Sequence, residues 1–209
     1  MTFGQRGSSD LLMILNGNMI DVRNVDEKLD KDFINTILEI DASVYPLNLQ
    51  GTFDEVYGRF KANRDTYVLL YCDDKLIGYF CFFPIKKILY DEIVNHDKLY
   101  DSDIPGKMLE QYEAFKTYKL YVISTAILPE YQKKGLSKYL IKGFFKFILD
   151  KKKNNIVFSS ALSTSVTPEG KIMLKKMGFK KIKTISDEYS LNELVMDDDF
   201  YRSIERTQK

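Results

Sequence analysis

Residues 123–140 constrain the fold of this chain more than any other stretch, because they predict a strand, a loop and a helix in direct succession. Apolar and β-branched residues run up to Leu128, Pro129 stops the strand, and a basic loop containing Gly135 leads into an amphipathic helix. The first four N–H groups of a helix lack partners within the helix, and the helix dipole places partial positive charge at the same end. A glycine lets a ligand approach the backbone closely. The stretch therefore predicts a binding site for a phosphate or pyrophosphate group.

The distribution of charge along the chain agrees with an anion site. Residues 132–183 contain 14 Lys and 2 acidic residues, a net charge of +12, whereas the rest of the chain contains 17 basic and 28 acidic residues, a net charge of −11. The basic segment suits a polyanionic ligand and the acidic remainder suits a cation, although solvated charged faces would leave the same pattern. A nucleic-acid partner is disfavoured, because the basic residues lie within one cofactor-like segment and lack an interleaved aromatic pattern.

The length of 209 residues and the apolar content of 44% predict one domain with one hydrophobic core. No apolar run approaches the roughly 18 residues that a membrane helix needs, so we expect no membrane partner. Cys72 and Cys81 are too few for a disulfide framework and fall on neighbouring predicted strands. We interpret them as buried free thiols of a cytoplasmic protein, with a cross-strand contact as the alternative.

Hydrophobic periodicity and capping signals predict a regular alternation of helices and strands. Thr52 and Glu55 form a capping box before one helix, and Thr167-Pro168 begins the last core helix, which Gly178 ends. The predicted helices are residues 30–44, 53–62, about 135–151 and the stretch between Thr167 and Gly178. The predicted strands are residues 19–25, 67–72, 76–85, 120–128, 156–162, 179–185 and 189–196.

Three segments depart from this alternation within and around a single predicted domain, residues 19–197. Residues 1–18 read as a leader, and residues 198–209 read as a polar C-terminal tail. The connection 86–119, with a predicted short helix at 107–116, is longer than the usual hairpin loop of about 2–5 residues. We interpret it as a lid or substrate-shaping insertion, with a structural flap or the contact of a homodimer as the alternatives.

Three short motifs, in this order, resemble motifs of the GNAT superfamily of N-acetyltransferases. Residues 127–129, Ile-Leu-Pro, resemble the Val-x-Pro that ends the family's fourth strand, and residues 132–137, Gln-Lys-Lys-Gly-Leu-Ser, resemble its Q/R-x-x-G-x-G/A loop. Residues 177–179, Met-Gly-Phe, resemble its Gly-Phe turn, whereas Ser137 departs from the last Gly or Ala of the loop. The resemblance implies an α/β (α+β) fold, with a mixed, mostly antiparallel sheet of six to seven strands and helices on both faces.

The resemblance also implies that acetyl-CoA is the cosubstrate and lies between the splayed fourth and fifth strands. The backbone of the fourth strand would pair with the pantetheine amides, the loop N–H groups would hold the pyrophosphate, and lysines would add charge-assisted contacts. The residues that the resemblance assigns to this site are Ala126, Ile127, Leu128, Gln132, Lys133, Lys134, Gly135, Leu136, Ser137 and Lys138. No residues have the spacing of metal ligands, so we expect no metal.

Residues that carry proton transfer in many members of the family are absent from this chain. Leu174 and Thr167 stand where the family often has a Tyr acid and an Asn. Tyr121 falls in the register where some members carry a carboxylate base, and we predict that it relays or donates a proton. A half-buried aromatic residue of the strand is the alternative interpretation of Tyr121.

Other candidates for proton transfer and amine binding are weakly marked. His96, the only histidine, has polar neighbours that favour an exposed surface position. Asp41 and Glu39 could bind a cationic acceptor. The sequence thus predicts an N-acetyltransferase that moves an acetyl group from acetyl-CoA directly to a primary amine, with a small-molecule acceptor favoured. A protein-amine acetyltransferase is a variant, and a non-catalytic acyl-CoA-binding module is the alternative.

Overall fold

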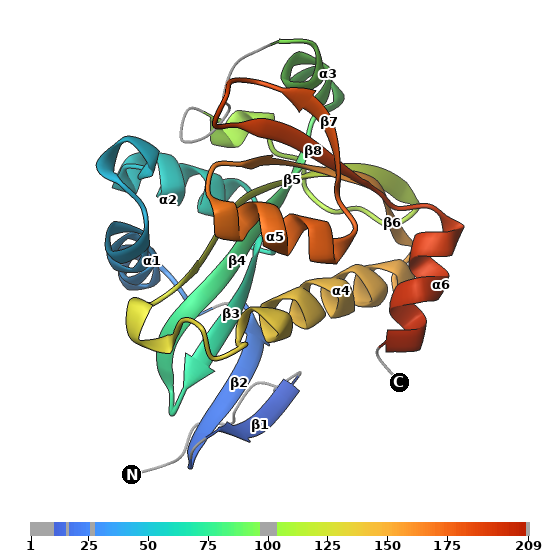
Figure 1. Cartoon of the computed structure of the whole chain (residues 1–209). Coiled ribbons are helices and arrows are strands. Elements are labelled where there is room, and N and C mark those ends of the chain that lie inside the picture. The colour runs from blue at the N-terminus through green and yellow to red at the C-terminus, as the bar shows by residue number, and fades with distance from the viewer. Residues whose placement is uncertain (1–10, 16, 26–27, 97–103, 208–209) are drawn as a thin grey trace.

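The computed structural model describes residues 11–15, 17–25, 28–96 and 104–207 (Figure 1). The strands are β1 (Leu11–Leu15), β2 (Asn18–Asn24), β3 (Tyr67–Cys72), β4 (Lys75–Ile85), β5 (Lys116–Ile127), β6 (Ile156–Ser165), β7 (Lys180–Thr184) and β8 (Ser190–Val195). The α-helices are α1 (Lys31–Val44), α2 (Phe53–Ala62), α3 (Lys87–Asn95), α4 (Ser137–Lys153), α5 (Pro168–Met177) and α6 (Asp198–Thr207). Short 3-10 turns occupy Leu47–Leu49, Gly106–Met108 and Pro129–Tyr131.

The described strands form one eight-stranded sheet in the order β1-β2-β3-β4-β5-β6-β8-β7. Neighbouring strands in this sheet are antiparallel, except for β5 and β6, which run parallel and are joined through α4. A parallel pair requires such a crossover, because the chain must return to the same end of the sheet. The sheet is therefore mixed and mostly antiparallel, as the sequence predicts.

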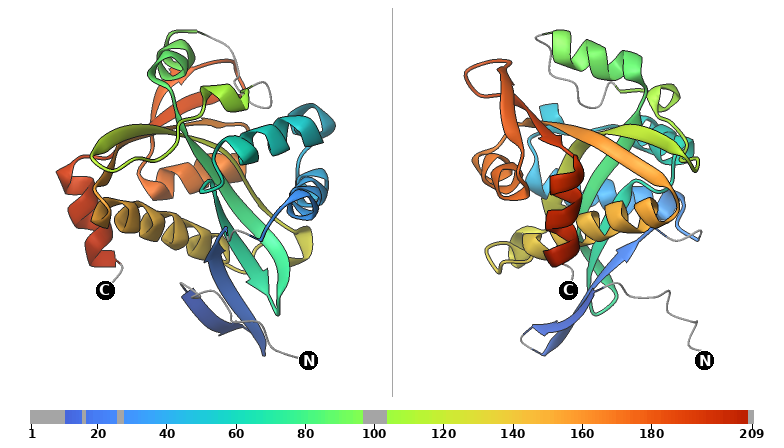
Figure 2. Two further views of the ribbon diagram at one scale, coloured as in Figure 1. Left: turned by 180° about the vertical axis from the view of Figure 1, so that it is seen from behind. Right: turned by 90° about the vertical axis from the view of Figure 1, so that its right-hand side faces the viewer.

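Helices cover both faces of the sheet (Figures 1 and 2). One face packs against the apolar sides of α4, α5 and α6, and the other packs against α1, α2 and α3. Gly143 lets α4 lie close to the sheet, because a Cβ there would come within 2.6 Å of Val68 Cγ1 and 2.8 Å of Val22 Cγ1. Within the described ranges, no helix is long and apolar enough to cross a membrane.

The predicted start and stop signals are confirmed where the residues themselves carry them. Thr52 and Glu55 form the capping box of α2, and the Thr167 hydroxyl caps α5. Gly178 ends α5 in the left-handed conformation, with a φ of +95°. Cys72 and Cys81 are both buried and free, as predicted. These local signals work because each depends on neighbouring residues alone.

Two segments at the ends of the chain are more regular than the sequence suggests. Within the predicted leader, β1 pairs with β2 and adds an eighth strand to the six or seven expected. Residues 1–10 lie outside the described residues. The predicted polar tail instead forms α6, which begins with Asp197 accepting the Phe200 N–H at 2.9 Å and buries Tyr201 and Ile204. Tyr201 and Ile204 lie three positions apart, so they share the face of α6 that packs on the core.

The insertion also differs from its prediction. It contains α3, whereas the predicted helix at 107–116 is replaced by the short turn Gly106–Met108 and an extended approach to β5. Residues 104–110 of the insertion pack on α2, where Asn63 Nδ2 donates to Glu110 O at 2.7 Å, whereas α3 lies against β7, where Lys183 Nζ donates to Val94 O at 2.9 Å. A Cβ on Gly106 would lie 2.6 Å from Gly58 O, so this glycine permits the close contact with α2. This arrangement favours a structural flap for the described part, and residues 97–103 lie outside the description.

Candidate active site

Strands β5 and β6 separate in the middle of the sheet. Their pairing ends at Val122 and Ser163, although β5 follows β4 as far as Ile127 and β6 follows β8 as far as Ser165. The register between β4 and β5 skips Ile123, which forms a β-bulge at the point of separation. Bulges increase the local bend of a strand and commonly lie beside active sites. One edge of β5 therefore faces a gap instead of a neighbouring strand.

Two residues of β5 direct their backbone groups into this gap. In an antiparallel pair, backbone groups point alternately toward and away from the partner strand. Leu128 N–H bonds Ile77 O in β4 at 2.9 Å, so by alternation the groups of Thr125 and Ile127 point away from β4. The side chain of Gln132 donates to Ile127 O at 2.8 Å, and the hydroxyl of Tyr45 donates to Thr125 O at 2.7 Å.

This register refines the predicted pantetheine contacts. Of the residues named from sequence, Ile127 presents its backbone groups to the gap. The Leu128 N–H instead bonds β4, and the backbone groups of Ala126 point toward Tyr79 of β4. Thr125, which the sequence reasoning did not name, has the same orientation as Ile127. Its buried hydroxyl oxygen has no hydrogen-bond partner among the described atoms. An unsatisfied buried oxygen beside a gap fits a ligand that brings a donor.

The loop before α4 has the geometry expected for anion binding. Lys133 and Gly135 adopt left-handed conformations, with φ of +60° and +72°. The first turn of α4 has no side-chain cap, whereas α1, α2 and α5 are capped by Asp30, Thr52 and Thr167. The N–H groups of that turn therefore point toward the loop with their partial positive charge available to an anion.

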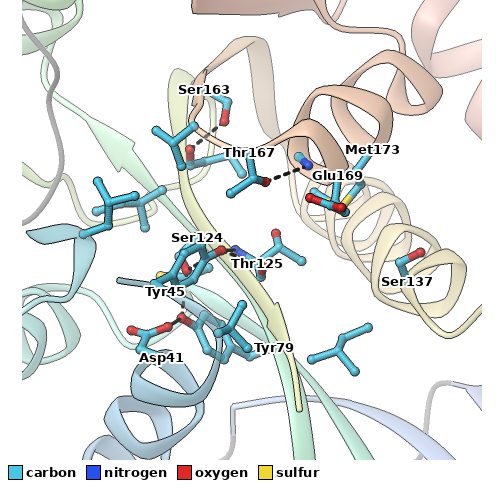
Figure 3. Close-up of a pocket in the computed structure, with 18 of the residues that line it drawn as sticks. Asp41, Tyr45, Tyr79, Ser124, Thr125, Ser137, Ser163, Thr167, Glu169 and Met173 are labelled. Atoms are coloured by element: carbon cyan, nitrogen blue, oxygen red, sulfur yellow. Dashed lines mark hydrogen bonds between the residues drawn. The ribbon is translucent and has the colours of Figure 1, made fainter. Parts of the chain in front are cut away.

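One cavity of about 630 Å³ connects the gap, the loop and the far side of the sheet. It runs from the N-terminal ends of α4 and α5, through the separation of β5 and β6, to a chamber beside α1 (Figure 3). Of the residues predicted to bind CoA, it is lined by Ile127, Gln132, Lys133, Gly135, Leu136 and Ser137. Ala126, Leu128, Lys134 and Lys138 do not line it. The cavity thus brings together six of the ten predicted residues.

Tyr121 lies in the wall of this cavity. Its side chain is almost entirely buried, with 1% of the residue exposed, and its hydroxyl is 3.2 Å from Thr164 Oγ1 across the β5–β6 boundary. The position fits both a group that transfers protons and a buried aromatic residue of the strand. Its role stays a prediction.

A chain of hydroxyl groups and one carboxylate lies at the other end of the cavity (Figure 3). The Tyr79 hydroxyl donates to Asp41 Oδ1 and lies 2.8 Å from Ser124 Oγ. Ser124 Oγ in turn donates to the Tyr45 hydroxyl at 3.5 Å. Helix α1 positions Asp41, β4 positions Tyr79, and β5 positions Ser124 next to the bulge. We call Asp41, Tyr79, Ser124 and Tyr45 the acceptor-side network.

Burial sets the protonation of two groups near this network. Burial first, and then the Asp41 carboxylate, raises the pKa of Tyr79 well above its ordinary value of 10.0, so its hydroxyl stays protonated. Burial raises the pKa of the Cys81 thiol to about 12. Tyr79 is therefore a fixed hydrogen-bond donor to Asp41, and Cys81 is a neutral thiol at neutral pH.

Of the remaining candidates, two lie outside the cavity and one lines it without an ionisable group. His96 is exposed at the end of α3 and does not line the cavity, as its polar neighbours predict. Glu39 is exposed on α1 and does not line the cavity either. Leu174 does line it, and its apolar side chain offers no proton where the family often has Tyr. None of the described insertion residues, 86–96 and 104–119, lines the cavity, and a lid role for the insertion stays a prediction.

The acceptor-side network was not predicted from the sequence, apart from Asp41 as one of several acids. Its members lie up to 83 positions apart in the chain, so no motif joins them. Tyr79 and Ser124 also fall in strands whose apolar neighbours predict ordinary core positions. The available signal was Asp41 itself, which stands on the apolar stripe of α1 where a hydrophobic residue is expected.

The fold resembles solved structures at low sequence identity. The loading GNATL domain of CurA from Lyngbya majuscula superposes with a TM-score of 0.64 over 85% of this chain and 98% of that one, at 13% identity. NAA60 from Arabidopsis thaliana, solved in complex with acetyl-CoA, has a TM-score of 0.52 over 84% of this chain and 99% of that one, at 13% identity. Naa50 from the same plant, in complex with the bisubstrate analogue CoA-Ac-MVNAL, has a TM-score of 0.52 over 84% and 97%, at 11% identity.

Sequence comparison supplies the family. No curated protein sequence matches this chain. Residues 34–164, however, match the family model described as the acetyltransferase (GNAT) family. This span covers more than half of the chain, from α1 to β6, and contains the β5 bulge, the Gln132–Ser137 loop and the acceptor-side network. The chain therefore belongs to the GNAT family of acetyltransferases.

Proposed function

We propose that this protein transfers the acetyl group of acetyl-CoA directly to a primary amine of a small molecule. The observation that carries the proposal is the continuity of the cavity. A single space joins an uncapped helix N-terminus, the open edge of β5 and a buried carboxylate. These three features suit a pyrophosphate, a pantetheine chain and a cationic amine in that order.

The loop and α4 would hold the pyrophosphate of acetyl-CoA. Backbone N–H groups from Gly135 to Lys138 would bind its oxygens, and the exposed lysine side chains around the loop would add charge. The gap-facing groups of Thr125 and Ile127 would pair with the pantetheine amides, in the place that a neighbouring strand would take. The thioester would then lie beside the β5 bulge, between the pyrophosphate site and the acceptor-side network.

The residues of the chain suit direct transfer to an amine. The amine must lose a proton before it attacks, and the leaving sulfur must accept one or depart as a thiolate. Tyr121 and Thr164 lie at the β5–β6 boundary, where a hydroxyl could serve the leaving sulfur. A backbone N–H group of β5 would stabilise the negative charge on the carbonyl oxygen. Because Cys81 is a neutral thiol, we expect no acetyl-cysteine intermediate.

The shape of the acceptor end favours a small molecule over a protein. Tyr45, Leu49 and Gly51, from the connection between α1 and α2, line the cavity there. This connection therefore forms part of the cavity wall. Apolar walls around one buried carboxylate offer few partners for the backbone of a peptide. We also propose a cytoplasmic location, which the two buried free thiols support.

Transfer assays with purified protein test the proposal. The protein is incubated with acetyl-CoA and one of three acceptor groups: small amines, peptides with free N-termini, or lysine peptides. Thiol release and mass spectrometry of the acceptor are measured together. We expect acetylated small amine in proportion to released CoA thiol. Preferred acetylation of peptides would replace the small-molecule proposal by the protein variant. Binding of acetyl-CoA without transfer to any acceptor would identify a non-catalytic acyl-CoA-binding module.

A further inference from the structure

Asp41 occupies a position that core packing alone would not select. With Ile37 and Val44 it lies on the face of α1 that looks into the cavity, at the helical spacing of an apolar stripe. Only 8% of Asp41 is exposed. A buried carboxylate costs free energy unless its charge is compensated by hydrogen bonds or an opposite charge. A residue that breaks the local packing rule in a cavity wall is a candidate for function.

The surroundings of Asp41 hold its carboxylate in place. The Tyr79 hydroxyl donates to Oδ1, and Tyr79 is itself 1% exposed with its ring packed 5.8 Å from the ring of Tyr67. A carboxylate has about four acceptor positions on its two oxygens, and the Tyr79 hydroxyl occupies one of them. Tyr79 cannot neutralise the charge, because it stays a phenol. The carboxylate is thus oriented by Tyr79 and remains suited to a cation in the cavity.

The same hydroxyl links Asp41 to the place where β5 and β6 separate. Tyr79 lies within hydrogen-bond distance of both Asp41 and Ser124, and Ser124 is the first residue after the β5 bulge. A proton can therefore pass from the bulge to Asp41 through two hydroxyl groups without crossing open solvent. No second carboxylate of the described residues lines this end of the cavity; Glu169 lies at the opposite end, on α5.

Other side chains at this end limit the kind of molecule that fits. The wall around Asp41 is apolar or aromatic and includes Ile37, Val44, Leu49 and Val56. Arg59 of α2 lines the same chamber, with its guanidinium donating to Ile104 O at 3.3 Å. A buried guanidinium in the wall repels positive charge, so the chamber accommodates no positive charge beyond the one that Asp41 compensates. The chamber thus fits one ammonium group attached to an apolar body.

We propose that Asp41 attracts the ammonium group of a primary monoamine with an apolar or aromatic body, and that the ammonium proton passes through Ser124 and Tyr79 to Asp41. The inference rests on the proposed acetyltransferase function and adds an acceptor class and a proton acceptor to it. Transfer of the proton from ammonium to carboxylate removes two buried charges at once, which an apolar chamber favours.

The protons, bonds and electron pairs of the reaction all balance with these groups. The ammonium gives one proton to the network, and its nitrogen lone pair then forms the C–N bond to the acetyl carbon. The C–S bond breaks with its electron pair on sulfur. The second proton lost from nitrogen ends on the CoA sulfur, and the proton held by Asp41 returns to solvent. The products are the N-acetyl amine and free CoA thiol, with no oxidant or reductant required.

Asp41→Asn tests the proposal, with Glu39→Gln as a matched control. Asn keeps the shape of Asp and can still accept the Tyr79 hydrogen bond, so the fold should be retained. Glu39 lies two residues away on the exposed side of α1, so its substitution removes the same charge from the same helix. With 2-phenylethylamine as the probe, we expect Asp41→Asn to lower kcat/KM for the amine at least about 100-fold. Glu39→Gln should leave it unchanged, and neither change should alter the KM for acetyl-CoA.

The pH dependence separates proton acceptance from a packing defect. The groups that face Asp41 are Tyr79 and Cys81 of β4, Tyr67 of β3, Tyr45 after α1, and Arg59 of α2. Without the carboxylate, only amine that is already neutral can react, and its fraction rises about tenfold per pH unit below the amine pKa. The deficit of Asp41→Asn should therefore shrink as pH rises toward about 10. A deficit that is constant with pH, or an accompanying loss of acetyl-CoA binding, would show a structural role and overturn the proposal.

A second variant and a small acceptor panel complete the test. Tyr79→Phe removes the link to Ser124, and we expect a lower kcat with a nearly unchanged KM for the amine. In the panel, 2-phenylethylamine and hexylamine should be acetylated in preference to spermidine, leucine and a peptide. Preference for spermidine or leucine would overturn the acceptor class. If the wild-type protein acetylates no amine, the proposed function itself is wrong. If the wild-type protein is active and the Asp41→Asn variant is equally active, only this inference is wrong.

Discussion

The hydroxyl of Tyr45 bonds both backbone groups of Thr125: it donates to the carbonyl oxygen at 2.7 Å and accepts the amide N–H at 3.3 Å. Thr125 lies on the edge of β5 that faces the gap, so the Tyr45 hydroxyl satisfies groups that a neighbouring strand would otherwise pair. These are the same groups that we expect to bind the pantetheine chain. Tyr45 and the cosubstrate should therefore compete for Thr125.

Tyr45→Phe tests this competition. The substitution keeps the aromatic ring and removes the hydroxyl, so acetyl-CoA no longer has to displace two hydrogen bonds. Each such bond contributes about 1 kcal/mol, so we expect up to about 30-fold tighter binding of acetyl-CoA in a calorimetric titration. Weaker binding would show instead that the hydroxyl contacts the bound cosubstrate.

Tyr201→Phe is the matched control for that experiment. The Tyr201 hydroxyl on α6 accepts Phe158 N–H at 2.9 Å and donates to Phe158 O at 3.1 Å, so it covers an edge of β6 in the same way, away from the cavity. We expect the control to lower the free energy of unfolding by about 1–2 kcal/mol and to leave the affinity for acetyl-CoA unchanged.

Gly135→Ala should weaken the binding of acetyl-CoA. Gly135 has a φ of +72°, and a Cβ there would meet no protein atom within 4 Å, so the methyl group would point into space beside the predicted phosphate. Gly17→Ala is the control, because Gly17 has a φ of +85° and equally open surroundings in the β1–β2 connection. Both should lose about 1 kcal/mol of stability to backbone strain. Only Gly135→Ala should bind acetyl-CoA more weakly than the wild type. If both variants bind acetyl-CoA with the same affinity, the loop does not hold the phosphate.

Tyr121→Phe separates the two interpretations of this residue. If the hydroxyl transfers a proton to the leaving sulfur, kcat should fall at least about tenfold while both KM values stay nearly constant. Thr164→Val should reproduce part of this loss, because it removes a hydroxyl that lies 3.2 Å from the Tyr121 hydroxyl and helps to orient it. An unchanged kcat in Tyr121→Phe would make the residue part of the hydrophobic core only.

The protonated thiol of Cys81 leads to one prediction about the pH profile of turnover and one about covalent acetylation of the protein. Because burial raises its pKa to about 12, Cys81 is protonated across the working range and should contribute no ionisation to turnover between about pH 6 and 9. Cys81→Ala should keep that part of the pH profile. Intact-protein mass spectrometry after exposure to acetyl-CoA should show unmodified protein. An acetylated Cys81 would contradict direct transfer.

Much of the fold could be predicted because its signals are local. The capping box of Thr52, the Pro168 start of α5 and the positive φ of Gly178 all follow from neighbouring residues. The strand β1 and the helix α6 were missed, because their stability comes from contacts with β2 and with the core rather than from their own pattern.

The candidate site also has parts that could be predicted from the sequence and parts that could not. The loop from Gln132 to Ser137 is contiguous in sequence, so its motif could be found, and the structure places it on the cavity. The orientation of Thr125 depends on the β4–β5 register and its bulge, which a single sequence does not specify. The acceptor-side network joins α1, β4 and β5 through side chains that only the folded chain brings together.

Calorimetric titration of acetyl-CoA into the purified wild-type protein, with ATP as the comparison, tests the central claim most directly. ATP shares the adenine nucleotide and phosphates but lacks the pantetheine chain that we assign to the gap beside Thr125. We predict a dissociation constant for acetyl-CoA on the order of micromolar and much weaker binding of ATP. Absence of acetyl-CoA binding, or equal affinity for the two ligands, would contradict the assignment of the gap and of the reaction built on it.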